Sequence, residues 1–268
     1  MKLLITGATG YLAANFINHC LAENIFLDQF KSITLLDRTI KQNRLVHLND
    51  NFVFITGDLQ AAPEDHYDCV LHFAYAKDIQ AEKNFLLKYK NSYLIFASSA
   101  AVYGNQDNLP ISPSAKPMPI SDYGRYKLEL EEFIQANFAK YLIVRIANPF
   151  GKEFAESKSF NTIVASRLET GDNVEIELNA DEPQELVRDF VPIRDFCEQI
   201  VNAFGKAGIL NVSSGKGLTL ETFVQMLNQL KYSGLKKIKF NYKGKNNNEI
   251  IKSILKPYEV YSPENSLK

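Results

Sequence analysis

The sequence predicts an α/β fold, a doubly wound parallel sheet followed by a small lobe, on three observations. Apolar segments alternate with helix-like segments through the first half of the chain, and a glycine turn follows the first apolar segment. After Gly151 this regular alternation ends. At 268 residues, the chain is long enough for one large α/β domain and a small appended lobe.

The strand candidates are continuous apolar runs rich in Val, Ile, Leu and Phe, as expected for strands buried on both faces of a parallel sheet. They are Lys2–Thr6, Ser32–Asp37, Asn51–Thr56, Asp68–Phe73, Tyr93–Ser98 and Tyr141–Ile146. The helix candidates between them are Tyr11–Glu23, Ile79–Lys90 and Tyr123–Phe138. This repeating β-α-β order, with right-handed crossovers, predicts a sheet of the Rossmann type.

The second part of the chain predicts only scattered elements. Residues 1–150 are expected to form a dinucleotide-binding domain, and residues 151–268 a small substrate lobe interleaved with the end of the main sheet. A strand at Glu175–Leu178 and helices at Arg194–Phe204 and Leu220–Gln229 are too few for a separate core, so we expect them to close over the carboxyl ends of the strands. The Lys- and Asn-rich stretch Leu235–Lys256 indicates a solvated, mobile surface, with a phosphate-attracting patch as the alternative.

Composition excludes several classes of partner. The formal net charge of -1 gives no reason to expect nucleic acid or a membrane surface, and no apolar run reaches bilayer length. The apolar N-terminus enters a glycine turn and is read as a first strand, not as a signal peptide. Cys20, Cys69 and Cys197 form no CxxC pair and are read as buried thiols of a cytoplasmic protein. The four histidines lack metal-ligand spacing, so no metal is expected.

The glycine turn after the first strand carries the dinucleotide signal. Gly7 and Gly10 allow a tight turn and a close approach to a pyrophosphate, which the following helix N-terminus would hold. Ala13 stands where a third glycine is usual and is still small enough for close packing. The cofactor-binding candidates of this segment are Gly7, Thr9, Gly10, Tyr11 and Leu12.

An acidic residue ends the second strand candidate. Asp37 is placed to accept hydrogen bonds from an adenosine ribose, which favours NAD over NADP. Arg38 could stack on adenine, or bind a 2′-phosphate if Asp37 turned away, so NADP stays open as the alternative.

Two further segments carry the signal for catalysis. Tyr123 and Lys127 stand at i and i+4 on one helix face, where an ammonium would lower the pKa of the phenol and make it a usable acid/base. The two serines at the end of the strand candidate Tyr93–Ser98, Ser98 and Ser99, could orient a reacting sugar hydroxyl. Each signal is weak alone, but their order after a dinucleotide turn argues against coincidence.

At this point the sequence resembles the extended short-chain dehydrogenases, the family of nucleotide-sugar epimerases, dehydratases and 4-ketoreductases. The resemblance runs from Met1 to about Ser214. It rests on TGATGYLA (6–13), GDL (57–59), HFAYAK (72–77), SSAAVYG (98–104), YGRYK (123–127), NPFG (148–151) and VRDFVPIRD (187–195).

The resemblance implies a role for each matching residue. Tyr123 would be the acid/base, Lys127 its partner and ribose anchor, and Ser99 the residue that orients the hydroxyl. Residues expected along the cofactor are Asp58, Leu59, Phe73, Ala74, Tyr75 and Lys77. Asn148 and Arg188 would hold the nucleotide-sugar, with Arg188 on a phosphate.

Each of these assignments has a plainer alternative. Asp58 could only cap a turn, and Asn148 could only satisfy the backbone before Pro149. Arg188 could only pair with Asp189 or Asp195 at the surface.

Four departures from the family narrow the expectation. Ala100-Ala101 replaces the Asp-Glu pair of the dehydratases, which argues against a 4,6-dehydratase. The short connection from His72 to Ser98 has room for about one helix, which puts the usual homodimer interface in doubt. Pro192 replaces a typical, non-catalytic histidine. No Arg-x-Gly-Asp-like segment that would hold the nucleotide is found.

The remaining chemistry is hydride transfer at a sugar carbon, most simply C4. A 4-ketoreductase of an NDP-4-keto-6-deoxy sugar, in which Tyr123 protonates the forming alkoxide, is placed marginally ahead of an NAD-dependent 4-epimerase. A non-catalytic NAD(P)-binding regulatory protein is the alternative from another class, and a reductase of non-sugar ketones is less favoured.

Overall fold

The computed structural model describes residues 1–151, 173–178, 186–232, 234, 236–244 and 252–261. Its largest feature is an eight-stranded sheet in the order β14-β10-β6-β5-β4-β1-β2-β3. All neighbouring strands run parallel except β10 and β14. The strands are β1 (Lys2–Thr6), β2 (Ser32–Asp37), β3 (Phe52–Thr56), β4 (Cys69–His72), β5 (Tyr93–Ser99), β6 (Tyr141–Ile146), β10 (Gly208–Val212) and β14 (Val260–Tyr261).

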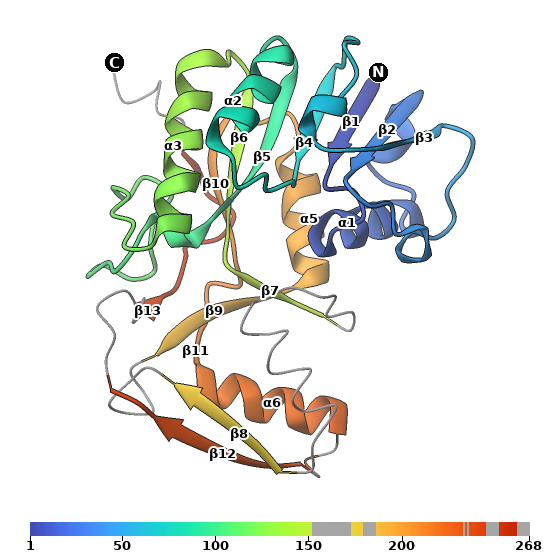
Figure 1. Cartoon of the computed structure of the whole chain (residues 1–268). Helices are drawn as coiled ribbons and strands as arrows, with labels where there is room; N and C mark the ends of the chain where they lie inside the picture. Colours follow the sequence, from blue (N-terminus) through green and yellow to red (C-terminus); the bar gives the residue numbers. More distant parts are fainter. Residues whose placement is uncertain (152–172, 179–185, 233, 235, 245–251, 262–268) are drawn as a thin grey trace.

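Helices cover both faces of this sheet (Figure 1). On one face, α1 (Tyr11–Ala22) and α5 (Ile193–Ala203) pack against a core that contains Phe16 and Phe196. On the other face, α2 (Ile79–Lys88) and α3 (Asp122–Asn137) pack against a core that contains Phe85 and Ile134. Two apolar faces explain why the central strands read as continuous apolar runs, and the predicted Rossmann-type fold is confirmed.

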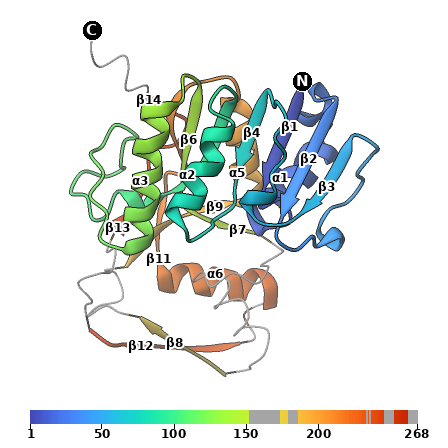
Figure 2. The ribbon, with the colours of Figure 1, turned by 45° about the horizontal axis from the view of Figure 1, so that its top comes forward.

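Short strands and one helix make up the rest of the structure, below the main sheet in Figures 1 and 2. The strand β9 (Val187–Pro192) pairs with β7 (Asn148–Phe150), β11 (Gly217–Thr219) and β13 (Lys252–Ser253). The strands β8 (Asn173–Leu178) and β12 (Lys237–Tyr242) form a separate parallel pair beside α6 (Leu220–Tyr232). We call β8, β12 and α6 the lobe.

The structure corrects three expectations about the second part of the chain. The helix predicted at Arg194–Phe204 is α5, which packs in the core of the main sheet and not in the lobe. The lobe has a hydrophobic cluster of its own around Phe223 and Ile176. The stretch Leu235–Lys256 is not only mobile surface, since it supplies β12 and β13 and the fully buried Leu255. Residues 235 and 245–251 lie outside the described part of the chain.

Candidate active site

A backbone contact explains the first glycine of the turn after β1. Gly7 has a φ of +64°, and a Cβ atom there would lie 2.9 Å from the backbone nitrogen of Ala74. Both the left-handed conformation and the close approach therefore require glycine. Gly10 donates its N–H to the Gly7 carbonyl (2.9 Å) and is the N-cap of α1, so the positive end of this helix faces the turn.

The acid at the end of β2 is held by the same turn. Asp37 Oδ2 accepts hydrogen bonds from the backbone N–H and the hydroxyl of Thr9, both at 2.8 Å. Arg44 Nη1 in turn donates to the Thr9 carbonyl at 2.9 Å. Thr9, which is only 2% exposed, thus positions Asp37 and does not itself line the pocket described next.

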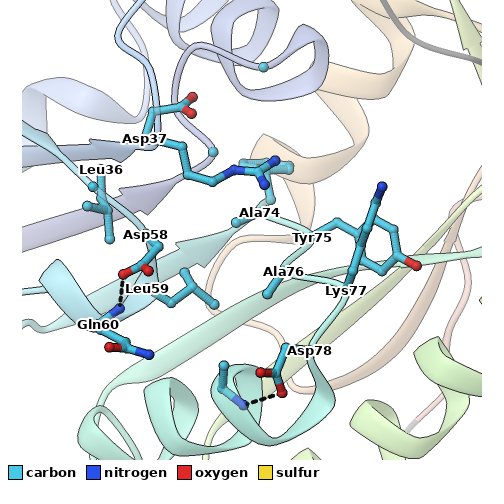
Figure 3. A pocket seen from close by; sticks show the side chains of 16 residues that line it. Leu36, Asp37, Asp58, Leu59, Gln60, Ala74, Tyr75, Ala76, Lys77 and Asp78 are labelled. Carbon is cyan, nitrogen blue, oxygen red and sulfur yellow. Dashed lines mark hydrogen bonds between the residues drawn. The ribbon is translucent and has the colours of Figure 1, made fainter.

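A pocket of about 700 Å³ opens where the strand order reverses between β1 and β4 (Figure 3). This reversal is the usual ligand site of open α/β sheets, and the volume lies in the range of ligand pockets. Ten predicted cofactor residues line the pocket: Gly7, Gly10, Asp37, Arg38, Asp58, Leu59, Phe73, Ala74, Tyr75 and Lys77. Tyr11 and Leu12, on α1, are not among its lining residues.

Six further described residues line the pocket and were not predicted: Leu36, Gly57, Gln60, Ala76, Asp78 and Ala81. The sequence offers one signal for Asp78, since an aspartate directly before a helix is a common N-cap. Its Oδ1 accepts hydrogen bonds from the N–H groups of Gln80 and Ala81. Asp58 likewise accepts from the Gln60 N–H at 2.9 Å. The plainer reading of Asp58 as a turn cap is therefore correct, although Asp58 also lines the pocket.

The candidate catalytic residues meet where β5 ends and α3 begins. Ser99 ends β5 and accepts a hydrogen bond from the Ala101 N–H (3.2 Å). Tyr123 lies in the first turn of α3, and its phenol interacts with the Ser99 hydroxyl. Gly124 makes this approach possible, because a Cβ atom there would lie 2.5 Å from the Ala101 carbonyl oxygen.

The predicted lowering of the Tyr123 pKa is wrong for the protein alone. Burial raises the pKa of Tyr123 to about 12, the hydrogen bond with Ser99 lowers it, and Tyr75 and Glu82 raise it. Because Tyr123 is 41% exposed, solvent screens part of this effect, but the phenol stays protonated at neutral pH. Lys127 is buried and donates to the Ala97 carbonyl (3.0 Å), and burial lowers the pKa of its ammonium.

Tyr75 lies between the pocket and the candidate catalytic residues. It lines the pocket, and its ring lies 5.4 Å from that of Tyr123 and 5.1 Å from that of Tyr126, both edge-on. The Lys127 ammonium lies 5.7 Å from the centre of the Tyr75 ring. A ligand in the pocket therefore has Tyr123 as a near neighbour.

The two predicted substrate residues lie on paired strands outside the pocket. Asn148, on β7, donates to the Asp189 carbonyl on β9 (2.9 Å). Its side chain therefore satisfies a backbone group, as the plainer alternative held, but that group lies on the neighbouring strand and not before Pro149. Arg188 donates to the Val187 carbonyl at 3.1 Å. Asp189 accepts from Ser214, Gly215 and Leu255, which ties the chain after β10 to β9.

Three further features of the described residues concern thiol reactivity, metal-binding clusters and membrane-spanning helices. Cys20, Cys69 and Cys197 are buried free thiols, as predicted, and burial raises the pKa of each. Within the described ranges, no group of three or more His, Cys, Asp or Glu side chains could hold a metal ion. No helix in this part of the chain is both long and apolar enough to cross a membrane.

The fold and the site together define a Rossmann-type protein of the extended short-chain dehydrogenase class. The chain belongs to the family described as RmlD substrate binding domain, whose model matches residues 1–181. The resemblance seen in the motifs is thereby confirmed.

Curated relatives match this chain at low identity. A putative UDP-arabinose 4-epimerase of Arabidopsis thaliana is 24% identical over 281 residues, 83% of this chain and 66% of that protein. A UDP-glucose 4-epimerase of Corynebacterium glutamicum is 25% identical over 281 residues, 86% of this chain and 80% of that protein. The chain thus spans just under two thirds of the length of the plant relative.

Solved structures share the fold over nearly the whole chain. A UDP-glucuronic acid 4-epimerase from Bacillus cereus, solved with UDP-glucuronic acid and NAD, gives a TM-score of 0.78 at 23% identity and covers 96% of this chain and 90% of its own. A dTDP-glucose 4,6-dehydratase from Streptomyces venezuelae, solved with NAD, gives 0.77 at 18% identity and covers 100% and 94%.

Proposed function

We propose that this protein binds NAD in the pocket and interconverts the C4 epimers of a UDP-sugar, with Tyr123 as the acid/base. The observation that carries the proposal is that the Ser99–Tyr123 pair adjoins a pocket of dinucleotide size through the ring of Tyr75. The names of the relatives, UDP-arabinose and UDP-glucose 4-epimerases, support both the reaction and the UDP-sugar class. We place the reaction in the cytoplasm, on the strength of the buried thiols.

The residues around the pocket fit a nicotinamide dinucleotide. Gly7 and Gly10 leave the backbone of the turn open to a pyrophosphate beside the N-terminus of α1. Asp37, held by Thr9, offers a carboxylate to a ribose, and Arg38 and Lys77 supply cations for phosphates. When bound, the nicotinamide would supply the hydride acceptor and donor.

The side chains of the site would handle the proton and the substrate. Ser99 would orient the sugar hydroxyl, and Tyr123 would exchange a proton with that oxygen. Lys127 would place a positive charge near Tyr123, one turn further along α3. Asn148 and Arg188 would grip the sugar nucleotide only if their present backbone contacts rearranged.

A 4-ketoreductase acting on an NDP-4-keto-6-deoxy sugar is the second candidate. A phenol that is protonated at neutral pH, as Tyr123 is, can serve as the acid that a reduction needs. In that reaction Tyr123 would protonate the forming alkoxide. NAD stays the preferred cofactor, and NADP the alternative, for both candidates.

Release of bound nucleotide tests the proposal first. The protein would be purified without added cofactor and denatured, and the nucleotide released would be identified by mass spectrometry. Stoichiometric NAD or NADH would support an epimerase that keeps its cofactor. Protein without nucleotide would favour the ketoreductase, whose cofactor leaves after each turnover.

The variant Tyr123→Phe tests the catalytic role. With UDP-glucose and UDP-arabinose as substrates, we expect kcat to fall by about 10²- to 10⁴-fold while NAD binding is unchanged. Tyr258→Phe, at an exposed tyrosine, is the matched control and should keep full activity. Equal activity in both variants would contradict the proposal, and a protein that binds NAD but turns over neither substrate would point to the regulatory alternative.

A further inference from the structure

A buried carboxylate contacts the backbone of the segment that lines the pocket. Glu82, on α2, has no exposed surface, which is rare for a glutamate unless it is paired. Its Oε2 accepts the Ala76 N–H (3.0 Å) and the Tyr126 hydroxyl (2.6 Å). Its Oε1 lies 3.1 Å from Nε2 of His72, at the end of β4.

These contacts reach the pocket through the backbone. Ala76 lies in the segment Tyr75–Lys77, whose residues line the pocket, and Lys77 adopts a φ of +64°, which non-glycine residues rarely take. The hydrogen bond from the Ala76 N–H to Glu82 therefore holds the strained segment Tyr75–Lys77 in place. Tyr126, which donates to the same oxygen, packs edge-on against the Tyr75 ring.

The same carboxylate acts on Lys127. Lys127 is 3% exposed. Its ammonium lies 4.7 Å from the centre of the Phe96 ring and 5.7 Å from that of the Tyr75 ring, and it donates to the Ala97 carbonyl. Burial lowers the pKa of Lys127, whereas the charges of Glu82, from α2, and Glu131, from its own helix, raise it. Glu131 is bound to Arg145 through both oxygens. Glu82 instead contacts the pocket-lining segment, through the Ala76 N–H.

We propose that Glu82 is a positioning residue that holds the segment Tyr75–Lys77 beside the pocket and, through Tyr126 and the Tyr75 ring, sets the surroundings of the buried ammonium of Lys127. The inference rests on the proposed function, because the surroundings of Lys127 matter only if Tyr123 exchanges protons. His72, Tyr126 and Lys127 are the titratable groups that surround Glu82, and Tyr123 also senses its charge.

The variant Glu82→Gln tests both parts, since it keeps the shape and an acceptor oxygen but removes the charge. The affinity for NAD⁺, measured by calorimetry, should fall roughly tenfold, as for the loss of a charged hydrogen-bond partner. The Lys127 Cε signal, followed by NMR in lysine-labelled protein without cofactor, should titrate about one pH unit or more lower. A merely structural residue would not shift this titration.

Glu129→Gln is the matched control, because Glu129 is an exposed carboxylate on α3 that pairs with Lys83. It should leave both measurements unchanged. If Glu82→Gln also kept the NAD⁺ affinity within twofold of the wild type and left the Lys127 titration unshifted, the inference would be wrong. A wild-type protein that bound neither NAD⁺ nor NADP⁺ would overturn the proposed function, while the Lys127 titration would still decide the role of Glu82 toward the lysine.

Tyr126→Phe covers the case in which Glu82→Gln does not fold. It removes one hydrogen bond and keeps the carboxylate, so NAD⁺ affinity should fall about two- to fivefold with no shift in the Lys127 titration. Unchanged NAD⁺ affinity in this variant would overturn the anchoring role of Glu82.

Discussion

At the scale of single residues, the choice between NAD and NADP depends on how Asp37 is held. Both hydrogen bonds from Thr9 go to Oδ2, so the carboxylate is held at the rim of the pocket beside Arg38. A fixed carboxylate at this position repels a 2′-phosphate. This geometry supports the preference for NAD that the sequence predicts.

Two substitutions at the rim test this preference. Asp37→Ala should weaken NAD⁺ binding about tenfold and NADP⁺ binding much less, because it removes both a ribose acceptor and a repulsive charge. Arg38→Ala should weaken NADP⁺ binding more than NAD⁺ binding. Dissociation constants from calorimetry would check both, with the exposed Asp50→Ala as control. Equal losses for the two cofactors in Asp37→Ala would contradict the assignment.

At the scale of elements, the contact between α3 and the turn after β5 decides whether Ser99 and Tyr123 meet. The i, i+4 spacing of Tyr123 and Lys127 predicts a shared helix face, but it says nothing of how close the helix comes to Ser99. That distance depends on Gly124, since any larger side chain would meet the Ala101 carbonyl.

Gly124→Ala should therefore destabilise the protein although alanine is the better helix former. The steric cost of about 1–3 kcal/mol should exceed the gain of about 1 kcal/mol in helix propensity, and Tyr123-dependent activity should fall as well. Urea unfolding would measure the change. Ala136→Gly, at an exposed position of the same helix, calibrates propensity alone and should cost about 0.5–1 kcal/mol. A more stable Gly124→Ala protein would refute this account.

At the scale of the whole molecule, aromatic packing attaches the lobe to β9. Phe223 of α6 is fully buried and stacks on Phe190 of β9, with ring centroids 3.6 Å apart. Strand β8 adds Val174, Ile176 and Leu178 to the same cluster. This cluster is separate from the two that sandwich the main sheet. We propose that it marks the substrate lobe, whereas α5, β10 and β14 of residues 151–268 belong with the dinucleotide-binding domain.

Phe223→Ala tests that division. It should cost about 3–5 kcal/mol of local stability and speed hydrogen exchange in β8 and α6, while exchange in β5 and β6 and the affinity for NAD⁺ stay close to wild type. Phe16→Ala, in the core of the main sheet, should instead speed exchange in β1 and α1. Faster exchange throughout the chain in Phe223→Ala would show that the molecule unfolds as one unit.

Local pattern alone predicts most of the first half of the chain. β1, β2 and β6 have the predicted ends, and ten predicted cofactor residues line one pocket. The prediction weakens after Gly151, where β9 and β10 were missed. β10 lies beside β6 although about sixty residues separate them in the chain, a pairing that no local pattern reports.

By itself, the sequence determined the fold class, the glycine turn and the identity of the candidate acid/base, because each is written in a short run of residues with its own periodicity or spacing. Only the tertiary structure decided the direction in which the pKa of Tyr123 shifts, the surroundings of Lys127 and the place of Glu82. A pKa depends on burial and on charges from distant segments, and β4, α2 and α3 bring His72, Glu82 and Lys127 together only once the chain has folded.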